Sequence, residues 1–212
     1  MNFFSRIFLG VLTINFSSLC FSQDTSERQL YNLLSPIKSF SANFSQQLMD
    51  EQGTTFQSLS GRLHAQKPNR VHWTVFEPAA QKIVSNGLRL WIYDPDLEQV
   101  IIEPYSNNPE ANPISLLLGD PQQLNEHFKL VAQPLVTDSK QQFILKPNQV
   151  NALYTNLMVE FNDRTLSAIS FTDNLGQKTH LRFKQFELNP LFTDDFFTFV
   201  VPEGVDIVSH VH

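Results

Sequence analysis

From Thr55 onward, apolar and polar residues alternate in short runs, and this two-residue period constrains the fold more than any other feature. Such a period places successive side chains on opposite faces of a β-strand. The runs are residues 70–75, 88–93, 157–162, 181–184 and 196–201. Turn-forming residues separate them at positions 68–69, 86–87, 94–96, 162–163 and 173–176. The pattern predicts one antiparallel sheet that is strongly curved or closed.

The N-terminal part of the chain indicates helix. Thr25 or Ser26 can cap a helix over residues 25–34, in which leucines recur at helical spacing, and Pro36 ends it. Residues 39–49 fit either a second helix or an entering strand, and a helix followed by a strand is favoured.

A second helical segment interrupts the strands in mid-chain. Residues 114–118 are nearly all apolar and stand between Asn112-Pro113 and Gly119. A short helix that is apolar all round should be buried or cover an apolar surface.

Residues 1–22 have the three parts of a secretory signal peptide. Arg6 precedes an apolar stretch over residues 7–21, and Cys20 and Ser22 supply small residues before the cleavage site. The apolar stretch is too short to span a bilayer comfortably. A lipoprotein signal cut before Cys20 is an alternative, but Leu19 is not the small residue that it requires. A buried N-terminal helix also fits. We expect a mature chain of residues 23–212 that forms a single domain.

The charge of the chain excludes one class of function. Fifteen Lys and Arg residues against 21 Asp and Glu residues give a formal net charge of −6. A protein that binds nucleic acid by neutralising phosphates needs a basic surface. We therefore expect no nucleic-acid partner.

Motifs for catalysis or metal binding are absent from the sequence. It has no G-x-S-x-G, no H-E-x-x-H, no C-x-x-C and no glycine-rich phosphate loop. Asp94 and Asp96 flank Pro95, which is typical of a turn rather than of a cation site. Spacing alone nominates no nucleophile and base, and we expect no metal and no cofactor. The apolar inner face of the sheet remains, either as an ordinary core or as a binding site for an apolar ligand.

Several short motifs, in order along the chain, resemble the LolA family of periplasmic outer-membrane lipoprotein carriers. They are residues 61–73 (GRLHAQKPNRVHW), 83–87 (IVSNG), 90–95 (LWIYDP) and 98–100 (EQV). Residues 39–40, 44–46 (FSQ), 113–118 and 197–199 (FTF, as a last strand before PEGV) continue the match. The resemblance covers nearly the whole chain after the predicted signal peptide.

The resemblance implies a mostly β fold with some α: an incomplete, half-open antiparallel β-barrel covered by a lid of short helices. Acyl chains of lipoproteins would bind between barrel and lid. Such a carrier is a periplasmic monomer that takes acylated lipoproteins from an inner-membrane ABC transporter and passes them to an outer-membrane receptor. The outer-membrane receptor has the same architecture but is itself lipidated. Leu19 disfavours lipidation at Cys20, so the resemblance favours the carrier over the receptor. No covalent step is needed, so no catalytic residue is expected.

Lid position and strand alternation together predict the residues that contact lipid. They are Leu30, Leu34, Val71, Trp73, Leu90, Ile92, Ile114, Leu117 and Leu118. If the inward phase is shifted by one residue, Trp91 and Tyr93 replace Leu90 and Ile92.

Lys67 departs from the pattern of the family. Members commonly have Arg before the proline of this strand, where it binds lid carbonyls and holds the lid shut. By the resemblance, those carbonyls belong to residues around Leu34 and to residues 117–118. Because Lys lacks the planar fork of Arg, we expect a weaker closed state, unless Lys67 is a surface residue at a strand end.

Two other functions remain open at this point. The same scaffold suits a carrier or sensor of another lipid or amphiphile. A hydrolase that acts on lipid is the third possibility.

Overall fold

The computed structural model describes residues 20–106, 108, 112–137 and 139–209. Of the predicted signal peptide, only residues 20–22 fall within these ranges, and they form the start of the first helix. By residue type, His210 and His212 are candidates for a weak metal site, although the end of a chain is more often frayed, and they lie outside these ranges.

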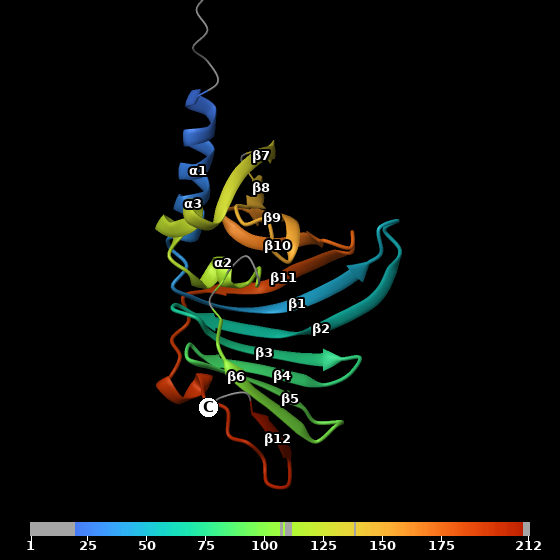
Figure 1. The fold of residues 1–212 in the computed structure, drawn as a ribbon. Helices are drawn as coiled ribbons and strands as arrows, with labels where there is room; N and C mark the ends of the chain where they lie inside the picture. The colour runs from blue at the N-terminus through green and yellow to red at the C-terminus, as the bar shows by residue number, and fades with distance from the viewer. Residues whose placement is uncertain (1–19, 107, 109–111, 138, 210–212) are drawn as a thin grey trace, which may run out of the picture.

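One twelve-strand sheet forms most of the structure, in the order β12-β6-β5-β4-β3-β2-β1-β11-β10-β9-β8-β7. Its strands are β1 Ser39–Met49, β2 Thr55–Gln66, β3 Arg70–Glu77, β4 Gln81–Asn86, β5 Arg89–Asp94, β6 Gln99–Pro104, β7 Phe128–Val136, β8 Lys140–Pro147, β9 Tyr154–Asn162, β10 Thr165–Asp173, β11 Lys178–Leu188 and β12 Asp206–Ser209. Neighbours are antiparallel, except that β12 runs parallel to β6. The sheet curves, and β7 and β12 end the order without pairing with each other (Figure 1). The predicted half-open barrel is confirmed.

Five helices accompany the sheet in the described part of the chain, and most of them are short. They are α1 Cys20–Leu34, α2 Ser115–Leu118, η1 Pro121–Gln123, α3 Leu124–His127 and η2 Asp194–Phe197. Helix α1 begins earlier than predicted but ends at Leu34 as expected. The predicted mid-chain helix is confirmed as α2, and all four of its residues are buried.

Two sequence predictions about single elements are wrong. Residues 39–49 are strand throughout, without a helical start. Phe40 and Phe44 stand at helical spacing, but residues four apart share a face in a strand as well as in a helix, so this spacing does not distinguish the two.

The predicted strand over residues 196–201 is also absent. Residues 194–197 form η2, and the next strand begins only at Asp206. The alternation there has another origin: Phe199 and Val201 pack against buried residues on the outer face of the sheet without joining it.

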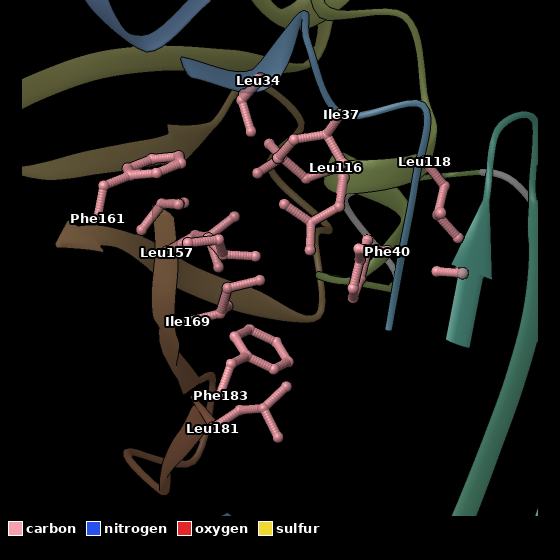
Figure 2. Packing of buried hydrophobic residues seen from close by; sticks show 14 of the residues in the cluster. Leu34, Ile37, Phe40, Leu116, Leu118, Leu157, Phe161, Ile169, Leu181 and Phe183 are labelled. Carbon is pink, nitrogen blue, oxygen red and sulfur yellow. The ribbon is translucent and has the colours of Figure 1, made fainter. Parts of the chain in front are cut away.

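The main core lies between the helices and the concave face of the sheet (Figure 2). Leu34 of α1 and Leu116 of α2 pack with Phe40 of β1 in one cluster. Each fully buried side chain of this size contributes roughly 1.5–3 kcal/mol. The helices are therefore held by the apolar face that they cover.

The segment between β11 and β12, residues 189–205, covers part of the outer face of the sheet, which is opposite the concave face. His64 and His72 stand opposite each other on β2 and β3. The ring centroid of His64 lies 5.6 Å from that of Phe192 and 5.1 Å from that of Phe196. Figure 1 shows this segment passing the strands on its way to β12. The rings keep both imidazoles partly buried.

Gly61 gives a test of the packing within the sheet. A Cβ atom at this position would lie 1.9 Å from the backbone oxygen of Thr74 and 2.8 Å from the ring of Phe44. Because the backbone must shift to admit this Cβ atom, Gly61→Ala should lower the free energy of unfolding by about 1–3 kcal/mol. Urea unfolding measures this. Gly119→Ala is the control, since its nearest atom is 3.4 Å away, and equal losses in both variants would contradict the packing.

The buried imidazoles predict a dependence of stability on pH. Burial, then Arg62 and then His72, lower the pKa of His64 from 6.5 to about 4. Below pH 6.5 the unfolded chain takes up a proton that the folded chain does not, so the free energy of unfolding falls from pH 6.5 towards pH 4. In His64→Phe, the free energy of unfolding should depend less on pH. Urea unfolding at about pH 7 and at about pH 5 measures the difference. An unchanged slope would assign the pH dependence to other groups.

Candidate functional site

An apolar cavity of about 300 Å³ lies on the concave face of the sheet. Small-molecule sites range over roughly 300–1,000 Å³, so this cavity is at the lower end. Its walls come from β1, β3, β4, β5, β10 and β11, from Tyr105 just after β6, and from the chain just before α2. The lining residues are Gln46, Val71, Trp73, Ile83, Leu90, Ile92, Tyr105, Asn112, Pro113, Ile114, Ile169, Phe171, Thr179 and Leu181.

Five of the nine residues predicted to contact lipid line this cavity. They are Val71, Trp73, Leu90, Ile92 and Ile114. They come from three separate parts of the sequence, and strand pairing brings them together: β3 pairs with β4, and β4 with β5.

The other four predicted residues lie elsewhere. Leu30, Leu34 and Leu117 are at most 1% exposed and belong to the core beneath the helices. Leu118 lines a second pocket, of about 470 Å³, between α2, α3 and the turn after β2. These side chains would line a ligand site only after the helices move away from the sheet.

The inward phase of β5 follows the prediction. Leu90 and Ile92 line the cavity, whereas Trp91 and Tyr93 pack with Val84 on the outer face. Cross-strand pairing fixes this phase, because Ile92 stands opposite the cavity residue Ile83. The shifted alternative is therefore excluded.

Sequence reasoning missed lining residues on the far side of the cavity. Ile169, Phe171 and Leu181 come from β10 and β11. The alternation at residues 181–184 predicted a strand around Leu181, whereas no run was identified over β10, and every strand has an inward row. The sequence held no signal for which inward residues meet a cavity and which meet a helix.

A polar contact ties α2 to the sheet beside the cavity. The hydroxyl oxygen of Tyr105 lies 3.1 Å from the hydroxyl oxygen of Ser115 in α2. Burial raises the pKa of Tyr105, against the opposing effect of this hydrogen bond, so the phenol is neutral. This hydrogen bond connects α2 to the chain just after β6, beside the cavity.

Lys67 makes part of the contact that was predicted for it. Its Nζ donates a hydrogen bond to the backbone oxygen of Leu34, at 3.4 Å. Within the described residues no bond joins it to the carbonyls of residues 117–118. Burial lowers the pKa of Lys67, and the Asp120 carboxylate partly offsets this. A distance of 3.4 Å is long for an N–H···O bond, which makes this a weak closing contact.

The Ser170–His180 pair is not a catalytic pair. Nε of Arg182 donates to Nε2 of His180 at 2.7 Å. A neutral imidazole then carries its proton on Nδ1, which donates to the Ser170 hydroxyl. Because this nitrogen has no lone pair for the hydroxyl proton, His180 does not activate Ser170.

Among residues 20–106, 108, 112–137 and 139–209, no group of three or more His, Cys, Asp or Glu side chains is placed to hold a metal ion. Within the same ranges, no helix has the length and apolar character needed to cross a membrane.

Comparison with known proteins supports one family. A family model described as "Outer membrane lipoprotein carrier protein LolA" matches residues 35–200. An outer-membrane lipoprotein carrier protein of Hahella chejuensis is 34% identical over 179 residues, which cover 84% of this chain and 86% of that protein. Its counterpart in Pseudomonas aeruginosa is 32% identical over 212 residues, 99% of this chain and 100% of that protein.

The fold has a counterpart among solved structures. An uncharacterized conserved protein from Thermus thermophilus matches with a TM-score of 0.55 at 12% identity, over 87% of this chain and 99% of that one. At this identity the likeness concerns the fold alone. The family model and the relatives, which span most of the chain and are named as carriers rather than enzymes, carry the assignment. The chain belongs to the LolA family of outer membrane lipoprotein carrier proteins.

Proposed function

We propose that this protein carries lipoproteins through the periplasm, with their acyl chains held between the sheet and the helices. The observation that supports this most directly is the apolar cavity on the concave face, in a chain of the lipoprotein-carrier family. Its apolar walls would stabilise an acyl chain relative to water, because burying each methylene group is worth about 0.8 kcal/mol.

The free energy of exposing acyl chains to water explains why a carrier is needed. Three acyl chains of about fifteen methylenes each would cost on the order of 36 kcal/mol to expose fully to water. A lipoprotein that crosses an aqueous compartment therefore needs an apolar container along the whole way.

A cavity of about 300 Å³ is the closed form of that container. We infer that cargo displaces α1 and α2, so that Leu30, Leu34, Leu117 and Leu118 exchange contacts with the sheet for contacts with acyl chains. In the empty protein the same leucines cover the concave face, which would otherwise be an aggregation-prone apolar patch. All nine predicted residues would then contact lipid in the loaded state.

The partners follow from the direction of transport. We infer an inner-membrane ABC transporter that loads the carrier and an outer-membrane receptor that unloads it. Residues 1–22 would act as the signal peptide that directs the chain to the periplasm, and the mature protein would act as a monomer.

Tryptophan fluorescence tests the proposed cargo. The chain has two tryptophans, and Trp73 lines the cavity while Trp91 packs on the opposite face. A triacylated lipoprotein, freed of detergent, should change the emission of the native protein and of Trp91→Phe, but not that of Trp73→Phe. The same lipoprotein without acyl chains should change none of them.

Native mass spectrometry of the same mixtures provides the control, since Trp73→Phe should still form the one-to-one complex. A response of Trp73 to a free fatty acid, with none to the acylated lipoprotein, would overturn the proposal. That result would favour a carrier of another amphiphile on this scaffold.

Lys67 should set the stability of the closed form. Because Arg can donate two hydrogen bonds in a fixed fork, Lys67→Arg should slow hydrogen exchange in residues 115–124 by roughly tenfold. Lys67→Met should accelerate exchange by a smaller factor, and in the last turn of α1 around Leu34, since it removes only the weak bond to the Leu34 carbonyl. The control is Lys38→Arg, at an exposed position nearby. Equal exchange in the native protein and in Lys67→Arg would contradict this role.

A further inference from the structure

We propose that Gln46 and Thr179 bind the carbonyl group of the acyl chain, and so fix the direction in which the chain lies in the cavity. The inference rests on the proposed function and adds a specificity-determining pair to it. The chain would point tail-first towards α2, with its ester or amide at the opposite end of the cavity.

Gln46 breaks the apolar pattern of its strand. On the inward face of β1 it follows Ala42 and Phe44, which are 1% and 4% exposed. The same face then presents a carboxamide to a cavity whose strand walls are otherwise mostly apolar. A polar side chain at an inward position is a local conflict, and such conflicts concentrate at functional sites.

Among the residues that the structure describes, none uses the hydrogen-bonding capacity of this pair of side chains. Neither the Gln46 carboxamide nor the Thr179 hydroxyl makes a side-chain hydrogen bond to any of the residues that the structure describes. The other polar groups in the wall are engaged: the Tyr105 hydroxyl bonds Ser115, and Oδ1 of Asn112 accepts from the backbone N–H of Ile114.

Strand register places the two side chains close together. Gln46 stands directly opposite Leu181, and Thr179 lies two residues from Leu181 on the same strand. Such diagonal neighbours on one face are within roughly 7–8 Å, which lets both reach one small polar group. The carboxamide N–H and the hydroxyl each donate to a carbonyl oxygen, and the carboxamide oxygen accepts from an amide N–H.

The same register gives the direction. Phe40 packs with Leu34 and Leu116 of the helices. Across the sheet it stands opposite Ala65, which in turn stands opposite Val71 in the cavity wall. Gln46 is six residues further along β1, about 20 Å from that row. Figure 2 shows Leu181, the partner of Gln46, at the end of the core away from Leu34. The polar pair and the helices therefore mark opposite ends of the site.

The ligand class follows from this arrangement. An acyl chain ends in a carbonyl group, whereas an alkyl ether of equal length does not. The pair therefore favours esters and amides of long-chain acids over hydrocarbon chains in general.

Two matched probes test the inference on the full chain: the hexadecanoyl ester and the hexadecyl ether of triethylene glycol, with affinities read from Trp73 fluorescence. Gln46→Leu, of similar size but without the carboxamide, should bind the ester about tenfold more weakly and the ether equally well or better. Gln47→Leu, at the exposed neighbouring position that faces outward, should change neither affinity.

Thr179→Val provides a second variant if Gln46→Leu fails to fold, and it should also weaken the ester selectively. Equal losses for ester and ether, or no loss for either, would overturn the inference and leave the carrier function standing. Failure of the native protein to bind both probes and the acylated lipoprotein would overturn the carrier function itself.

Discussion

Packing of short helices against the concave face of the sheet is the interaction on which the rest of the structure depends. Helix α2 has four residues, and a helix of that length has no stability of its own in water. It exists because its leucines are buried in the core that Phe40 and its neighbours supply. The helices and the sheet therefore stabilise each other through one apolar surface.

The same surface links stability to function. Apolar contacts have no direction, so acyl chains can replace leucines against the sheet at little net change in buried area. Among the described residues, the directional contacts that join the helices to the sheet include a long bond from Lys67 to Leu34 and a bond between Tyr105 and Ser115. A lid held mainly by non-directional contacts is suited to a ligand that offers contacts of the same kind.

Much of the fold was predictable from local patterns in the sequence. The two-residue period identified β3, β5, β9 and β11, and even the inward phase of Leu90 and Ile92, because each strand keeps one face in the core. The short helix over α2 followed from an apolar run between Pro113 and Gly119. The errors arose where one pattern fits two structures: residues 39–49 suited both helix and strand, and the alternation at 196–201 came from packing on the outer face.

The sequence by itself determined that the chain forms a curved, largely antiparallel sheet with apolar helices, and its motifs pointed to the family. Tertiary structure decided which apolar residues form a cavity and which form a core. Val71 and Leu30 have the same chemistry in the sequence, yet one lines the cavity and the other is fully covered. It also decided that Gln46 and Thr179 both line that cavity. These outcomes depend on pairing between strands distant in sequence, and side-chain periodicity within one strand carries no information about its partners.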